Sequence, residues 1–284
     1  MVLRFGLRLM DKDWRSHFLS NYHGSTLGSY SNTLNRFPCP DIKAVTSQDV
    51  RQWLDDLDCE ISTKQKHLNC LRTFFNWLVR QGAIERTPTP REFKLPRCRD
   101  ALNERILTPQ EVADFLEALH RDTRRSQKNC DRNYLFFKVI YYLGLRISEA
   151  TRLRWRDFNR DGSQVSIFGK GGKTRIVAVP VALWEELSQW AVEKRGYVFT
   201  SETGKLLTRD QLHKIIKTAA AAAGIENAEY VSAHWLRHSH ATHALKGGAP
   251  IHLVQKSLGH ASLETTGRYL HVTGGESSSN YLGI

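Results

Sequence analysis

The chain has 284 residues, of which 40% are hydrophobic and 25% charged, a composition typical of a soluble globular protein with room for two domains. No run of residues is long and apolar enough to cross a bilayer, and arginines interrupt the apolar N-terminus. We therefore expect a cytoplasmic protein without a signal peptide or a membrane contact. Five scattered cysteines without a CxxC pair predict neither a disulfide framework nor a zinc knuckle.

Basic residues are in excess in both parts of the chain, for a net charge of +12. Residues 1–100 contain 16 Lys and Arg against 11 Asp and Glu, and residues 101–284 contain 25 against 18. Lysine and arginine neutralise phosphates and release counterions, so the excess favours a polyanionic partner. A basic protein without such a partner is the alternative that charge alone leaves open.

Residues 1–86 are predicted to form a small helical bundle. Three segments combine a capping residue with helical spacing of apolar side chains, and a fourth helix is expected nearby. These helices are expected within residues 11–22, 25–37, 46–57 and 62–82. Three prolines among charged residues then disfavour helix, so a linker is placed at 87–105, either solvated or lying against phosphates.

Residues 106–284 are predicted to form a second domain. Thr108, Pro109 and Glu111 have the pattern of a capping box at a helix start, and an apolar helix pair over 133–153 breaks near Gly144. Two alternating strands surround a glycine-rich turn within 164–180, and most of the remainder reads as helix. The expected fold class is therefore mainly α with a small β-sheet.

Four segments of the second domain contain side chains suited to phosphate chemistry. "GLRISEA" places an arginine behind an apolar run with a glutamate at i+3, and "GKGGK" places two lysines in a turn. "HWLRHSHATH" puts two histidines and an arginine on one helix face, and "LGHASLETTGRYLHV" adds a histidine and a tyrosine. The candidates are Arg146, Glu149, Lys170 or Lys173, His234, Arg237, His238, His260 and Tyr269.

Each segment taken singly also has a structural explanation. Arg146 and Glu149 could form an ion pair, the lysines could be solvated in an ordinary hairpin, and a lone tyrosine is usually core or surface. A zinc site of the His-Glu-x-x-His type is a poor fit because Trp235 stands where the glutamate is needed. We expect His240 and His243 to be packed or solvent-facing rather than functional.

Together the side chains suit a transfer of phosphoester bonds. Two guanidinium groups can neutralise the charge of a pentacoordinate transition state, and a lysine can protonate a leaving oxygen. Histidines can shuttle protons near neutral pH, and a tyrosine hydroxyl can attack phosphorus to form a covalent phosphotyrosine. Such an enzyme needs neither a metal nor another cofactor.

The order of these motifs resembles that of the tyrosine recombinase (phage integrase) superfamily, especially its Xer-like and integrase-like members. The resemblance covers nearly the whole chain, and it implies a helical core-binding domain followed by an α+β catalytic domain. It implies that Arg146 and Arg237 bind the scissile phosphate, Lys173 rather than Lys170 protonates the 5′ oxygen, and His234 and His260 assist. Tyr269 would attack, and Glu149 would support the arginines; His238 is left without a role.

The resemblance also implies partners and alternatives. The expected partner is double-stranded DNA, bound by a homo-tetramer on two paired sites or by a hetero-tetramer with a paralogue. The reaction would be site-specific DNA integration, excision or resolution. Two other functions stay open: a relaxing enzyme like the type IB topoisomerases, and a DNA-binding protein of the same fold without catalysis.

Overall fold

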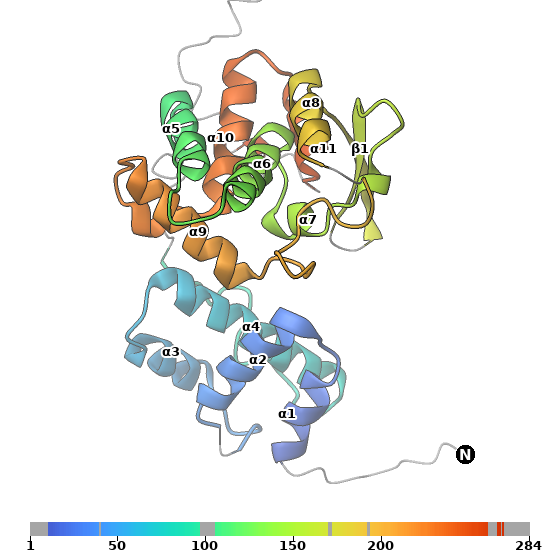
Figure 1. Ribbon diagram of the computed structural model, residues 1–284. Coiled ribbons are helices and arrows are strands. Elements are labelled where there is room, and N and C mark those ends of the chain that lie inside the picture. The colour runs from blue at the N-terminus through green and yellow to red at the C-terminus, as the bar shows by residue number, and fades with distance from the viewer. Residues whose placement is uncertain are drawn as a thin grey trace, which may run out of the picture. The chain divides into compact units, whose positions relative to one another are not determined.

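The computed structural model describes residues 11–39, 41–96, 106–169, 172–191, 194–260, 266–267 and 269. The chain divides into two compact units, residues 1–99 and residues 100–284, which Figure 1 shows as ribbons. In the described part of the chain, no helix is both long and apolar enough to cross a membrane. The expected class, mainly helical with one small sheet, is confirmed.

The N-terminal unit contains the four expected helices around an aromatic core. Phe18, Phe74 and Phe75 are fully buried, and the Phe18 and Phe74 rings meet edge to face with centroids 5.1 Å apart. The Thr46 side chain caps the third helix by accepting a hydrogen bond from the Asp49 N–H. The helices are α1 (Asp11–Leu19), α2 (Gly24–Arg36), α3 (Ser47–Asp56) and α4 (Ile61–Arg80). The last of them begins slightly before the expected range of 62–82, with Glu60 at the N-cap.

The first part of the expected linker packs on the N-terminal unit. Phe93 is buried in its core, and the Phe93 carbonyl accepts a hydrogen bond from Arg72 of α4. The Ser47 hydroxyl donates to the Pro88 carbonyl at 2.7 Å. The prolines keep this segment from becoming helical, but its apolar side chains still have a core to cover. Residues 97–105 lie outside the described residues.

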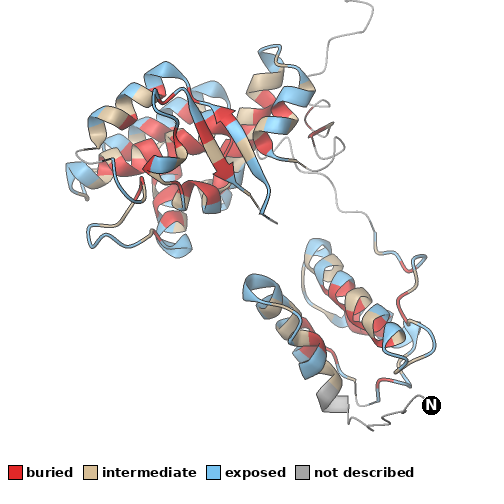
Figure 2. Ribbon diagram, turned by 90° about the vertical axis from the view of Figure 1, so that its right-hand side faces the viewer, coloured by how far each residue is buried: buried red, intermediate tan, exposed pale blue. Residues whose placement is uncertain are grey.

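The C-terminal unit is built around one helix that is buried on several sides. Helix α6 contributes Phe136, Phe137 and Ile140 to the core, and α5 and α10 pack against it. Figure 2 shows in red the buried positions of the helices and strands. The elements are α5 (Pro109–His120), α6 (Gln127–Leu143), α7 (Ile147–Thr151), β1 (Gln164–Phe168), β2 (Thr174–Ala178), α8 (Val181–Trp190), α9 (Arg209–Ala222), α10 (Ala233–Lys246) and α11 (Ile251–Leu258).

Local sequence explains how several of these elements begin and pair. The Thr108 and Glu111 capping box opens α5 as expected. Strands β1 and β2 form an antiparallel hairpin in which Val165 faces Val177, and these two valines are buried. Gly144 ends α6 in the left-handed conformation, where a residue with a Cβ atom is strained. The break at Gly144 starts α7 in a new direction, and this places Arg146 at its N-cap.

Candidate functional site

Arg146 and Glu149 form the pair that their spacing predicts. Glu149 Oε2 accepts a hydrogen bond from the Arg146 backbone N–H at 2.9 Å, and Oε1 accepts one from Arg146 Nη1 at 2.9 Å. The Glu149 side chain is 4% exposed, whereas about a third of the Arg146 side chain, 35%, is exposed. Glu149 therefore both caps α7 and orients a guanidinium that a ligand can reach.

A second arginine, which sequence analysis did not identify, shares this carboxylate. Arg175 of β2 donates from Nη1 to Glu149 Oε1 at 2.9 Å and from Nη2 to Oε2 at 2.8 Å. Its Nε donates to the Ser257 carbonyl near the end of α11 at 2.7 Å. Arg175 and the buried Val177 are two positions apart, so their side chains share the inner face of β2. A charged residue in an inward position of a strand was the signal that could have revealed it.

The hydrogen bonds decide the charge state of Glu149. Burial alone would raise the pKa of this carboxyl, but hydrogen bonds from Arg175 and from the Arg146 backbone, with the charge of Arg175, lower it below its usual value. The carboxylate is therefore ionised at neutral pH. It offsets part of the positive charge of the arginines gathered around it.

Arg237 of α10 is buried and forms a cluster with Arg146, Glu149 and Arg175. The residue is 3% exposed, and it donates to the Gly144 carbonyl at 2.5 Å and to the Leu258 carbonyl at 2.6 Å. Its Nη1 lies 3.9 Å from Glu149 Oε2. Burial, followed by the charge of Arg146, lowers the pKa of Arg237 to about 10, so the guanidinium stays protonated at neutral pH. The chain thus holds a buried cation with the carbonyls at the ends of α6 and α11.

Tyr269 lies in the same cluster. The residue is 3% exposed, and its hydroxyl oxygen lies 2.6 Å from Nδ1 of His238. The ring of His260 is nearly parallel to the Tyr269 ring, at 11° and with centroids 6.4 Å apart. His260 Nδ1 is also hydrogen-bonded to Thr266 Oγ1 at 2.9 Å. Burial, then the charges of Arg237 and Arg146, lowers the pKa of His260 to about 4, so this imidazole is neutral at pH 7.

His234 lies at the exposed start of α10, one turn before His238, with ring centroids 6.4 Å apart. Desolvation, then the charges of Arg237 and Arg146, lowers the pKa of His234. The shared face predicted for His234, Arg237 and His238 thus brings all three to the cluster. Among the described residues, no three His, Cys, Asp or Glu side chains come together as a metal site would need.

The other two histidines of α10 have structural contacts, as expected. His240 packs against Gly144 so closely that a Cβ atom there would lie 2.8 Å from the ring. Burial lowers the pKa of His240 to about 4. His243 Nδ1 is hydrogen-bonded to the Tyr141 hydroxyl at 2.8 Å.

The hairpin lysines are less closely tied to the cluster. Lys173 is exposed just before β2, and its carbonyl accepts a hydrogen bond from the Gly169 N–H at 2.8 Å. A Cβ atom on Gly169 would lie 3.8 Å from Glu149 Oε1, so the base of the hairpin adjoins the arginines. Within the described residues, no contact joins the Lys173 side chain to the cluster. Lys170 lies outside the described residues.

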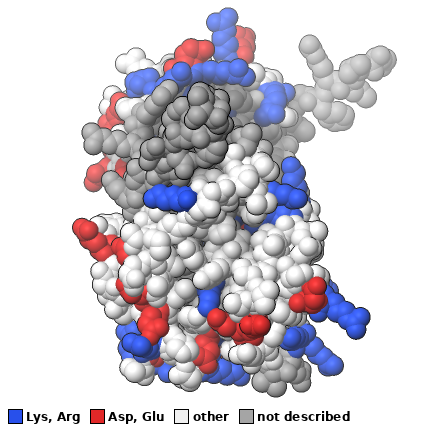
Figure 3. Space-filling view, turned by 90° about the horizontal axis from the view of Figure 1, so that it is seen from above, with Lys and Arg blue, Asp and Glu red and all other residues white. Residues whose placement is uncertain are grey.

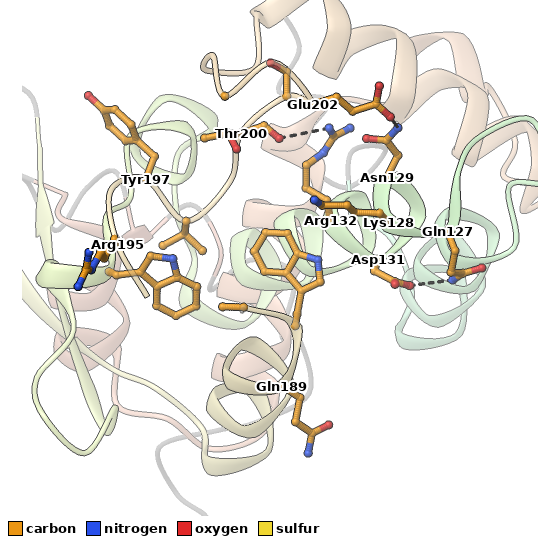
Figure 4. Close-up of a pocket in the computed structure, with 16 residues that line it drawn as sticks. Gln127, Lys128, Asn129, Asp131, Arg132, Gln189, Arg195, Tyr197, Thr200 and Glu202 are labelled. Atoms are coloured by element: carbon orange, nitrogen blue, oxygen red, sulfur yellow. Dashed lines mark hydrogen bonds between the residues drawn. The ribbon is translucent and has the colours of Figure 1, made fainter. Parts of the chain in front are cut away.

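A cavity of about 780 Å³ lies elsewhere in the C-terminal unit, beside the first turns of α6 (Figure 4). Its lining includes Asn129, Arg132, Thr200 and Glu202. Arg132 donates to the Thr200 carbonyl at 3.3 Å, and Asn129 donates to Glu202 Oε1 at 2.6 Å. These bonds tie α6 to the loop that precedes α9. Within the part of the chain that the structure describes, no residue of the arginine and tyrosine cluster lines this cavity.

Comparison with known proteins gives a consistent result. Residues 105–276 match the model of the phage integrase family. The tyrosine recombinase XerC of Halalkalibacterium halodurans is 31% identical over 286 residues, which cover 93% of this chain and 89% of XerC. The tyrosine recombinase XerD of Oceanobacillus iheyensis is 33% identical over 230 residues, which cover 78% of this chain and 74% of XerD.

Solved structures of recombinases also share the fold. The XerH site-specific recombinase, bound to a palindromic difH substrate in a post-cleavage complex, has a TM-score of 0.74 and 26% identity. That match covers 93% of this chain and 81% of XerH. A lambda integrase dimer bound to a COC′ core site has a TM-score of 0.74 at 15% identity. That match covers 95% of this chain and 98% of the lambda integrase chain. The resemblance drawn from the motifs is confirmed, and the chain belongs to the phage integrase family of tyrosine recombinases.

Proposed function

We propose that this protein cuts and rejoins DNA strands at specific sites through a transient covalent bond between Tyr269 and a 3′ phosphate. The observation that carries the proposal is the position of Tyr269. Its oxygen lies in one cluster with Arg237, His238 and His260, in a chain whose relatives are named tyrosine recombinases. Because the phosphotyrosine keeps the energy of the phosphoester, rejoining needs no metal and no nucleotide.

Arg146 and Arg237 are the proposed ligands of the scissile phosphate. The buried Arg237 is already oriented by two carbonyls, and Arg146 by Glu149, so neither has to reorganise when negative charge develops on the phosphate oxygens. His260 is neutral at pH 7, and it would therefore assist as a hydrogen-bonding group rather than as a cation. His234 would bind the phosphate from the exposed start of α10.

The lysine of the hairpin is the proposed acid that protonates the departing 5′ oxygen. We assign this role to Lys173, with Lys170 as the alternative in the same turn. A substrate whose leaving oxygen is replaced by sulfur needs no protonation, so it should restore cleavage to the variant that lacks the acid. Comparing Lys173→Ala and Lys170→Ala on this substrate distinguishes the two lysines, because sulfur should restore cleavage to only one of them.

The proposed partner is double-stranded DNA, bound by four copies of the chain on two paired sites, or by two copies with two of a paralogue. The DNA in the XerH and lambda integrase structures supports DNA as the partner. The net charge of +12 favours a polyanion, although Lys and Arg are interspersed with Asp and Glu on the face in Figure 3. Sedimentation of the protein with a duplex that carries one site or two would measure the number of copies.

The test of the chemistry is a duplex with a nick close to the cleavage site, from which the cut fragment diffuses away. The protein should form a covalent adduct with this duplex, and Tyr269→Phe should form none. Tyr230→Phe is the matched control, because Tyr230 is 69% exposed and outside the cluster. A binding-only protein would give no adduct with any variant. A topoisomerase-like enzyme would relax plasmids that lack a recombination site.

A further inference from the structure

Arg175 connects the hairpin that carries the proposed acid to the helix that follows Arg146. Its Nη1 and Nη2 donate to the two oxygens of Glu149, at 2.9 and 2.8 Å, and the same carboxylate accepts from Arg146. The side chain of Arg175 is 10% exposed and that of Glu149 is 4% exposed, so water competes little for these bonds. A planar guanidinium that bonds both oxygens of a carboxylate fixes distance and angle together. The first residues of β2 are therefore held against α7.

The same side chain also reaches the end of α11. Nε of Arg175 donates to the Ser257 carbonyl at 2.7 Å, and the next carbonyl, that of Leu258, accepts a hydrogen bond from Arg237 at 2.6 Å. A Cβ atom on Gly259 would lie 3.0 Å from Cδ of Arg175, so the end of the helix packs closely on this side chain. Arg175 thus contacts the segments that orient both of the arginines proposed to bind the scissile phosphate.

Lys173 depends on the strand for its position. The pairing of β1 with β2 continues one step beyond the two strands, where the Gly169 N–H donates to the Lys173 carbonyl at 2.8 Å. Residues two apart in a strand share a face and lie about 7 Å apart, so Lys173 is on the same face as Arg175. Within the described residues no contact holds the Lys173 side chain, so the backbone next to Arg175 determines where its ammonium group can reach.

We propose that Arg175 is a positioning residue, which places Lys173 where it can protonate the departing 5′ oxygen. Arg175 acts through the start of β2, which it fixes against the two segments that orient Arg146 and Arg237. Loss of this connection should leave the phosphate ligands and the nucleophile in place but displace the acid. A displacement of 1 Å in an active site can cost about 100-fold in rate. This inference rests on the proposed function, because it explains how one residue of the same reaction is placed.

Arg175→Lys tests this role. Lysine keeps the positive charge beside Glu149, but its ammonium group does not reproduce the planar fork that bonds both carboxylate oxygens and the Ser257 carbonyl. The measurement is the single-turnover rate of adduct formation on the nicked duplex, with oxygen or with sulfur as the leaving atom. We expect Arg175→Lys to slow the reaction of the oxygen substrate by about 30-fold, and that of the sulfur substrate by less than about threefold.

A second variant displaces the hairpin and keeps every charged side chain. A Cβ atom on Gly169 would lie 3.2 Å from the Lys173 carbonyl oxygen, which is closer than ordinary contact, and 3.8 Å from Nη1 of Arg175. Gly169→Ala should therefore shift the backbone at Lys173 while the ion pair with Glu149 stays intact. We expect the oxygen substrate to react about fivefold more slowly and the sulfur substrate to stay within about twofold.

The matched control for a general loss of stability is Arg132→Lys. Arg132 is also buried in the C-terminal unit, at 7% exposure, and it donates to Asn133 Oδ1 and to the Thr200 carbonyl. This variant disrupts the same kind of buried fork away from the hairpin. We expect its thermal midpoint to fall, while both rates, measured below that midpoint, stay within about twofold of those of the unmodified protein.

A double variant decides whether Arg175 acts through Lys173. In Lys173→Ala there is no acid to position, so adding Arg175→Lys should slow the oxygen substrate by less than about threefold further. Full multiplication of the two losses would overturn the inference. A normal oxygen rate in Arg175→Lys, or equal slowing of both substrates, would overturn it too. Should Arg175→Lys fail to fold, the same criteria apply to Gly169→Ala. In each case the unmodified protein still forms its adduct, whereas failure of the proposed function would remove that adduct with both substrates.

Discussion

Replacing Glu149 by Gln should destabilise the C-terminal unit strongly. The substitution keeps the shape of the side chain but removes the charge that pairs with Arg175 through two hydrogen bonds and with Arg146 through one more. Because the Glu149 side chain is 4% exposed, water does not replace the lost partner. Breaking a buried ion pair by removing one partner costs about 3–5 kcal/mol. For a unit of this size that loss corresponds to a fall in the thermal midpoint of about 10 °C.

The assay is thermal unfolding at pH 7, where the lowered pKa keeps Glu149 ionised. The free energy that this carboxylate contributes is fully present above its unfolded-state pKa, and it is lost as pH falls through the lowered pKa of the folded state. Glu117→Gln is the matched control, because Glu117 pairs with Arg121 on the surface, where such a pair contributes about 0–1 kcal/mol. Equal midpoints for the two variants would refute this account of the cluster.

Three further predictions concern the elements around the site. Gly144→Ala should lower the free energy of unfolding by more than the roughly 1–2 kcal/mol of left-handed strain, because the new Cβ atom would also meet His240. Gly204→Ala, also at positive φ but in open space, should show only the strain in a urea titration. His240 is neutral in the folded state, where its pKa is about 4. As pH falls from 6.5 to 4, its protonation in the unfolded chain should lower the free energy of unfolding by up to about 3 kcal/mol. Urea titrations across that range should show a shallower fall for His240→Gln. Thr108→Ala should cost about 1 kcal/mol in the same assay through loss of the α5 cap.

Most helices could be predicted from sequence because their signals are local. A capping box at Thr108 or Thr46 and the apolar spacing that follows act within a few residues, so no tertiary information is needed. The pairing of Arg146 with Glu149 was predicted for the same reason, since the two residues are three positions apart on one turn of helix.

Contacts between distant segments could not be read in this way. Arg175 joins Glu149 across 26 positions and Ser257 across 82, and nothing near it in the sequence indicates either partner. His238 contacts the hydroxyl of Tyr269, which is 31 positions away. Prolines at 88, 90 and 96 predict a linker at 87–105, but Phe93 packs on a core whose surface the sequence does not show.

The bonds of Arg237 also have a consequence for the folding of the chain. They join α10 to Gly144 across 93 positions and to Leu258 across 21. Closing such long loops is slow, so we expect these contacts to form only after α6, α10 and α11 have docked. A nascent or partly unfolded chain would then hold its tyrosine without the oriented guanidinium. The order of folding would thus keep an incomplete molecule from cutting DNA that it is unable to reseal.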